Sequence, residues 1–163
     1  MKTLLIVYHT RTGGTLQMAT AAAEAARAEA GVETRLIRAG EATPDDVLGA
    51  DGYIFACPEN LAALSGEMKE FFDRCYYPVL GRIEGRPYAL MVCAGSDGEN
   101  AVRQMARIAT GWRLKAVADP IIVNTAAQTP EAILAPKTIP EPELARCAEL
   151  GQALAAGLAL GVF

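Results

Sequence analysis

The stretch that decides the fold is Lys2–Thr15, KTLLIVYHTRTGGT. Its apolar run, Leu4–Tyr8, is typical of a central strand that is buried on both faces of a sheet. A turn of threonines and glycines follows, and after it an alanine-rich segment with high helix propensity. A strand, a glycine turn and a helix in this order direct backbone N–H groups and a helix N-terminus at an anion. The sequence therefore predicts an anion-binding loop over residues 10–15.

Two better-known phosphate-binding motifs do not fit this loop. No lysine follows the glycines, which excludes a Walker A loop. The spacing is not Gly-x-Gly-x-x-Gly, and the strand expected at 32–38 ends in Arg35 and Arg38 rather than in an acid for a ribose. A phosphate loop of another kind and an ordinary strand-to-helix turn with a threonine N-cap both remain open.

Length and composition indicate a compact globular protein. The chain has 163 residues, of which 52% are hydrophobic and 21% charged, and we expect one domain over residues 1–163. The net charge of −4 is spread evenly and leaves no basic stripe, so no nucleic-acid partner is expected. An electron carrier that docks on basic partners is usually more acidic, and the charge counts weakly against that role.

The cysteines and the chain ends indicate where the protein works. The four cysteines form no CxxC pair and there is a single histidine, so we expect no transition-metal site and a reduced compartment. An apolar strand begins almost at Met1, which predicts the absence of a signal peptide. The apolar segment 150–163 has only 14 residues, too few to span a bilayer. These features predict a cytoplasmic protein without a membrane partner.

Strands and helices are expected to alternate along the chain. Apolar runs predict strands at 4–8, 32–38, 53–57, 88–93 and within 115–123, the last one interrupted or ended by Pro120. Helices are expected at 14–30, from 43, before Pro78, before Gly111 and at 143–160. Short turns between them imply right-handed crossovers and a five-stranded parallel sheet. The polar strand 32–38 suits an edge, which favours the order 2-1-3-4-5, with a ligand beyond the ends of strands one and three.

One connection is unusually long. Residues 125–142 carry four prolines and no clear periodicity. Connections of this length are usually functional covers or interface arms.

Three loops together resemble a known family. The pattern Thr-x-Thr-Gly-x-Thr at 10–15 resembles the phosphate loop of flavodoxin-like FMN proteins. Residues 57–73 resemble the Pro-x-Asn/Tyr…Lys-x-Phe-x-Asp stretch of NAD(P)H-dependent FMN and quinone reductases, and residues 95–100 resemble their glycine-rich flavin segment. The resemblance covers about residues 1–123. It implies a flavodoxin-like three-layer α/β/α fold, FMN as the cofactor and NAD(P)H as the electron donor.

The resemblance also implies a role for each loop. The residues that would wrap the FMN phosphate are Thr10, Arg11, Thr12, Gly13, Gly14 and Thr15. Those that would line the isoalloxazine, with main-chain donors near its N5 and O4 atoms, are Pro58, Glu59, Asn60 and Leu61. Those that would contact its pyrimidine side are Gly95, Ser96, Asp97 and Gly98, with Asn100 as a neighbour.

The second and third loops depart from the flavodoxin pattern because they contain no Phe, Trp or Tyr to stack on the flavin. One ring face is then open to a nicotinamide or substrate, or is covered by a second subunit or by 125–142. We therefore predict an FMN-binding oxidoreductase that passes hydride from NAD(P)H to a small acceptor such as a quinone or free flavin. The chemistry takes place on flavin N5, without a catalytic side chain. The alternatives are a one-electron carrier and a flavin-free binding module; the resemblance also suggests a homodimer.

Several single residues have two interpretations each. Glu59 either disfavours an anionic reduced flavin or faces solvent. His9 is either structural or a neighbour of the site, and Arg11 either meets a phosphate, of FMN or of NADPH, or is solvated. Cys57 and Cys93 lie at the ends of apolar runs, where cysteine behaves as a small hydrophobe.

Overall fold

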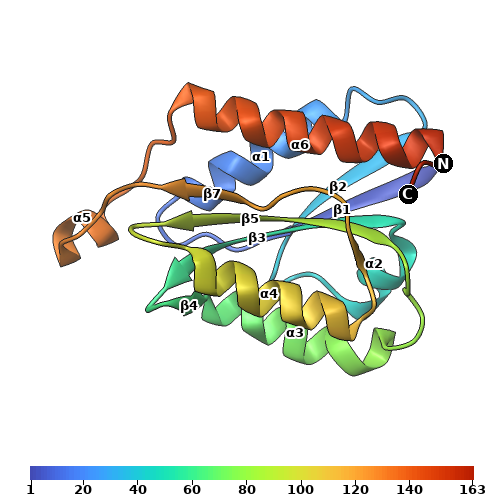
Figure 1. Cartoon of the computed structure of the whole chain (residues 1–163), viewed down its shortest axis with the longest axis horizontal. Coiled ribbons are helices and arrows are strands. Elements are labelled where there is room, and N and C mark those ends of the chain that lie inside the picture. Colours follow the sequence, from blue (N-terminus) through green and yellow to red (C-terminus); the bar gives the residue numbers. More distant parts are fainter.

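The structure is organised around a sheet whose parallel strands follow the expected order (Figure 1). It is a computed structural model that describes residues 1–163. In chain order the strands are β1 (Lys2–Tyr8), β2 (Val32–Arg38), β3 (Gly52–Asn60), β4 (Ala63–Leu64), β5 (Pro87–Ala94), β6 (Lys115–Ala116) and β7 (Ile121–Asn124). β1 lies between β2 and β3, β5 pairs with β3, and β6 and β7 both pair with β5. With β6 and β7 counted as one interrupted strand, this is the predicted order 2-1-3-4-5.

The strand count differs from the prediction for two physical reasons. The expected fifth strand is interrupted at 117–120, which includes Pro120, a residue without an N–H to donate to a neighbouring strand. The expected loop 58–65 is largely a hairpin, because β3 continues to Asn60 and pairs antiparallel with β4. The sheet therefore has seven strands rather than five.

Helices cover both faces of the sheet and confirm the three-layer architecture (Figure 1). They are α1 (Gly14–Ala26), α2 (Pro44–Gly49), α3 (Gly66–Val79), α4 (Glu99–Gly111), α5 (Pro130–Leu134) and α6 (Glu141–Leu160). α1 and α6 lie on one face, and α2, α3 and α4 lie on the other. The short helix α5 stands away from both layers, has no buried residue and exposes Ile133 and Leu134.

Three helix boundaries differ from the prediction. α1 ends at Ala26 rather than near residue 30, although Gly31 does adopt the left-handed conformation (φ 87°) on the way into β2. α3 extends one residue beyond Pro78. α6 begins at Glu141, because Pro142 lies in the first turn, where a missing N–H costs nothing.

Helix α5 was not expected, although the sequence contains its signal. The Thr129 hydroxyl accepts a hydrogen bond from the Ala132 N–H at 3.2 Å, and Pro130 takes the first helical position. The same signal correctly predicted α2, where Thr43 caps and Pro44 follows.

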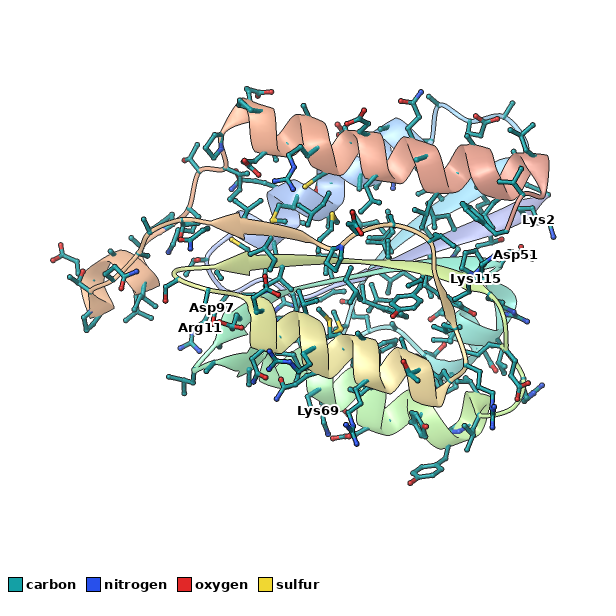
Figure 2. All side chains as sticks on the ribbon, viewed as in Figure 1. Lys2, Arg11, Asp51, Lys69, Asp97 and Lys115 are labelled. Carbon is teal, nitrogen blue, oxygen red and sulfur yellow. The ribbon has the colours of Figure 1, made fainter.

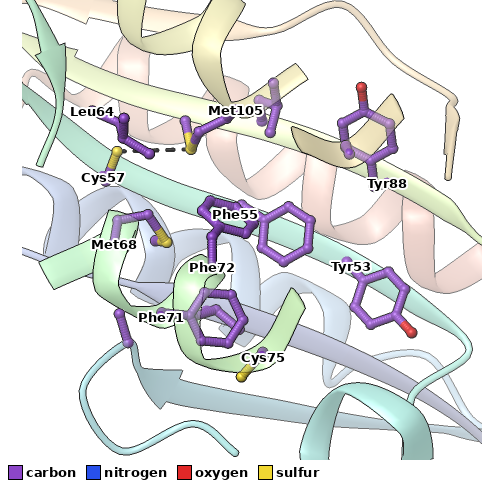
Figure 3. Packing of buried hydrophobic residues seen from close by; sticks show 14 of the residues in the cluster. Tyr53, Phe55, Cys57, Leu64, Met68, Phe71, Phe72, Cys75, Tyr88 and Met105 are labelled. Atoms are coloured by element: carbon purple, nitrogen blue, oxygen red, sulfur yellow. Dashed lines mark hydrogen bonds between the residues drawn. The ribbon is translucent and has the colours of Figure 1, made fainter. Parts of the chain in front are cut away.

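The core lies in two layers, one on each face of the sheet. Leu5 and Val7 face α2, α3 and α4, whereas Leu4 and Ile6 face α1 and α6. Figure 3 shows the first layer around Phe55, whose ring centroid lies 5.2 Å from that of Phe72. Such aromatic contacts add to the free energy of area burial.

Trp112 and the four cysteines are packing residues, as predicted for Cys57 and Cys93. Trp112 is fully buried, and its indole N–H donates to the Tyr76 carbonyl at 3.0 Å. All four cysteines are free and buried, and burial raises the pKa of the Cys57 and Cys93 thiols to about 11. No helix has both the length and the apolar character that a membrane span requires.

The contact between α1 and α6 depends on Gly151. A Cβ atom at this position would clash with the carbonyl oxygen of Ala22 in α1. We expect Gly151→Ala to lower the free energy of unfolding by about 1–3 kcal/mol, because two helix backbones must separate. Urea denaturation measures the change. Gly49→Ala is the matched control, since a Cβ there meets nothing within 4 Å; an equal loss in both variants would contradict the interpretation.

Candidate functional site

The loop after β1 needs both of its glycines. Gly13 adopts a left-handed conformation (φ 95°), and its N–H donates to the Thr10 hydroxyl oxygen at 3.0 Å. A Cβ atom at Gly14 would lie 2.8 Å from Cys93 Sγ, so the start of α1 packs directly on β5. These constraints hold the first turn of α1 against the carboxyl end of the sheet.

The same loop contains polar groups without partners. The backbone N–H groups of Arg11, Thr12, Gly14 and Thr15 have no acceptor in the chain. The Thr15 side chain is buried, with 1% of its surface exposed, and its hydroxyl has no hydrogen-bond partner. A buried polar group without a partner costs about 1–3 kcal/mol. Phosphate oxygens are acceptors that would satisfy these donors, so the residues present fit a phosphate group.

A second helix at the same edge provides an internal comparison. α4 also follows a left-handed glycine, Gly98 (φ 98°). Its first turn, however, is capped by the Glu59 carboxylate, which accepts from the N–H groups of Gly98 and Ala101 at 3.0 Å each. Helix N-termini favour negative charge. The chain thus supplies an anion to α4 and none to α1.

The Glu59 side chain therefore caps α4 rather than pointing freely into solvent, which was one of its two interpretations. Its carboxylate ties the second loop to the third. Two further hydrogen bonds strengthen this tie: the Asn100 side-chain amide donates to the Ala62 carbonyl at 2.6 Å, and the Leu64 N–H donates to Gln104 Oε1 at 2.9 Å. The 59–64 hairpin and the start of α4 form one unit.

The tip of the hairpin presents main-chain donors. Leu61 and Ala62 both have positive φ, 50° and 61°, as in the tight two-residue turns of hairpins. The N–H groups of these two residues have no acceptor in the chain, and the Leu61 side chain is fully exposed. Pro58 and Asn60 lead into this tip from β3.

The third loop contributes a second set of free donors. The N–H groups of Gly95, Ser96 and Asp97 have no acceptor in the chain. The loop is held from behind, because a Cβ at Gly95 would lie 2.6 Å from the Ala127 carbonyl oxygen. Gly98 is different: it is buried, and its N–H is already bound by Glu59.

The structure brings the predicted loops to one edge of the sheet. Figure 2 shows Arg11 and Asp97 at this edge, with Lys2 and Asp51 at the opposite one. Two clefts of about 270 and 490 Å³ are lined by Lys2 and Asp51 and lie away from all three loops. Arg11 is exposed and has no partner in the chain.

His9 lies at the rim of this site. Its Nδ1 atom is 2.7 Å from Ser65 Oγ at the start of α3. Burial lowers the pKa of His9, although the nearby Glu67 carboxylate raises it. The side chain thus links the end of β1 to the start of α3.

Two residues that sequence reasoning did not select also contact the phosphate loop. Gln17 donates to the carbonyls of Gly13 and Lys137, at 3.0 and 2.8 Å, and accepts from the Ile139 N–H at 2.9 Å. The Lys137 ammonium donates to Thr12 Oγ1 at 3.3 Å. Apart from the contact of Gln17 with Gly13, these partners lie more than 100 positions apart in the chain, so no local pattern could identify them.

The strand order, the three layers and the position of the loops define a flavodoxin-like α/β protein. The structure of the flavodoxin, WrbA-like protein from Agrobacterium tumefaciens superimposes with a TM-score of 0.76, at 18% identity and over 99% of each chain. A likeness at this level of identity concerns the fold.

The sequence comparison identifies the family. The model of the NADPH-dependent FMN reductase family matches residues 41–128, more than half of the chain. The chain therefore belongs to this family, and the family description agrees with the flavin and the electron donor expected from the sequence. The match includes the second and third loops but not the phosphate loop.

Two relatives carry different names. The chain is 42% identical to a flavodoxin of Aquifex aeolicus over 106 residues, which is 64% of this chain and 57% of that protein. It is 33% identical to an NAD(P)H dehydrogenase (quinone) of Acidithiobacillus ferrooxidans over 94 residues, which is 45% of this chain and 47% of that protein. The matched part spans about half the length of these relatives.

The cap that Glu59 provides can be tested by substitution. We expect Glu59→Ala to lower the free energy of unfolding by about 1–2 kcal/mol, because two N–H groups of α4 lose their acceptor. Glu59→Gln keeps one oxygen and should lose less. Urea denaturation measures both changes, with the exposed Glu131→Ala as the control. A Glu59→Ala variant as stable as the control would contradict the cap.

Proposed function

We propose that this protein binds FMN at the carboxyl edge of the sheet and passes hydride from NAD(P)H to a small acceptor such as a quinone or free flavin. The observation that carries the proposal is the buried Thr15 hydroxyl, which has no partner. It lies in the first turn of α1, which has no side-chain cap. Membership of the NADPH-dependent FMN reductase family supports the same flavin and donor. Bound FMN supplies the redox chemistry at its N5 atom.

The three loops share the work of holding the cofactor in this proposal. The threonines and free amides of residues 10–15 bind the phosphate. The tip of the 59–64 hairpin and the amides of 95–97 approach the flavin ring from two sides. A helix terminus contributes about 0.3–1 kcal/mol to an exposed anion, whereas nanomolar affinity requires about 12 kcal/mol. Burial of about 300 Å² of ring surface adds about 7 kcal/mol gross, so the ring loops are as necessary as the phosphate loop.

The absence of aromatic side chains in the ring loops supports hydride transfer. Residues 58–65 and 94–100 contain no Phe, Trp or Tyr. The large aromatic cluster around Phe55 lies in the core between the sheet and α3 and is buried. A flavin ring face without a stacked side chain leaves room for a nicotinamide. The hydride transfer itself needs no acid or base from the protein.

A second candidate function is one-electron transfer between proteins. The relative with 42% identity is named a flavodoxin, which favours this alternative. The net charge of −4 is small for a carrier that docks on basic partners. A flavin-free binding module is the third alternative. The N–H groups and the Thr15 hydroxyl of the phosphate loop, which have no partners in the chain, argue against it.

The three candidates give different results with one preparation. We expect the protein to bind FMN with a yellow absorption band and to oxidise NADPH when a quinone is present. Stopped-flow absorbance measures both steps. A carrier would bind FMN, accept electrons in two separated one-electron steps and oxidise NADPH slowly. Protein that retains no yellow flavin after incubation with FMN and removal of the unbound cofactor would contradict the proposed function.

The Thr15 hydroxyl allows a test with effects of opposite sign. Thr15→Val removes an unsatisfied buried group, so we expect the apoprotein to become more stable by about 1 kcal/mol. FMN should bind about tenfold more weakly, because the phosphate loses a donor. Urea denaturation and flavin fluorescence quenching measure the two effects.

Thr34→Val is the matched control for this test. Thr34 has the only other buried, unpartnered hydroxyl, and it lies in β2. We expect this variant to gain stability without a change in FMN affinity. Equal FMN affinity in the two variants would show that Thr15 does not contact the phosphate.

A further inference from the structure

Lys137 lies in the connection between α5 and α6, outside the segment that matches the family. Its ammonium group donates to three oxygens: the carbonyls of Ile133 and Ala135, at 2.9 and 2.6 Å, and Thr12 Oγ1, at 3.3 Å. A lysine ammonium has three hydrogens, so each has an acceptor. The first two bonds cap the end of α5, and the third reaches the phosphate loop.

The backbone of this lysine is bound to the same loop. The Lys137 N–H donates to the Thr12 carbonyl at 2.9 Å, and the Lys137 carbonyl accepts from Gln17 in α1. The Ile139 N–H donates to the same Gln17 side chain. The ammonium is thus held in place before any ligand arrives, which limits the entropy that ordering it would cost.

The direction of the bond to Thr12 has a chemical consequence. Because the ammonium is the donor, it occupies the hydroxyl oxygen and leaves the hydroxyl proton for another acceptor. No carboxylate forms an ion pair with Lys137. The phosphate loop therefore has an un-neutralised positive charge beside it and a threonine oriented as a donor, both of which favour a dianionic phosphate.

We propose that Lys137 is the positioning residue of the phosphate site and that it selects FMN over riboflavin by holding the Thr12 hydroxyl as a donor and adding a positive charge. This inference rests on the proposed function, since it concerns the phosphate of the same cofactor. It also assigns a role to the 125–142 connection, because the Lys137 side chain joins the end of α5 to the phosphate loop.

The test compares the affinities of the apoprotein for FMN and riboflavin, measured by flavin fluorescence quenching. We expect Lys137→Met to weaken FMN binding about tenfold or more and to leave riboflavin binding within about twofold. Lys137→Arg should recover part of the loss. Added salt should reduce the difference between wild type and Lys137→Met, because it screens the charge. Lys115→Met is the matched control, an exposed lysine at the opposite edge of the sheet (Figure 2).

A double-mutant cycle separates action through Thr12 from a general effect. If Lys137 acts through the hydroxyl, Thr12→Val and Lys137→Met should cost less together than the sum of the two separate losses. Equal weakening of FMN and riboflavin would show that Lys137 only supports the loop, and unchanged FMN affinity would exclude any role; both outcomes overturn this inference alone. A wild-type protein that binds neither flavin would overturn the proposed function and this inference with it.

Discussion

The structure depends on the parallel pairing of β1 with both of its neighbours. Leu4–Val7 are fully buried, and the strand is paired residue by residue with β2 on one side and β3 on the other. Every backbone group of a strand buried in this way needs a partner in the sheet. Because the register places Tyr8 beside Ala56, the loop after β1 begins next to β3, which continues for four more residues to Asn60 at the same edge of the sheet. The candidate site is a consequence of this register.

The N-termini of α1 and α4 differ in whether the chain supplies a negative charge to them. α1 and α4 both start after left-handed glycines, and both point their first turns toward the same edge. Glu59 neutralises the end of α4 and at the same time links two loops. The N-terminal turn of α1 has no carboxylate bound to it and contains the buried Thr15 hydroxyl, which has no partner. It also lies beside Lys137. An anion is therefore favoured at α1 and disfavoured at α4.

The long connection after β7 contacts two of the three loops at the carboxyl edge of the sheet. It is tied to the third loop, since the Thr125 N–H donates to the Ala94 carbonyl at 2.8 Å and Gly95 packs on Ala127. It is tied to the first loop through Lys137 and Thr12. Its middle, α5, touches neither layer. The connection is thus anchored on both sides of α5.

The sequence by itself determined the alternation of strands and helices, because apolar runs and glycine turns are local signals. The polar strand 32–38 favoured the strand order and the edge where the loops meet, and the resemblance of the three loops implied the three layers. It also contained the signal for α5 at Thr129. Only the tertiary structure decided that Leu61 and Ala62 form a tight turn, that Glu59 caps α4 and that Lys137 reaches Thr12. These features join residues far apart in the chain or place ordinary residues in unusual backbone conformations, and neither leaves a periodic pattern in the sequence.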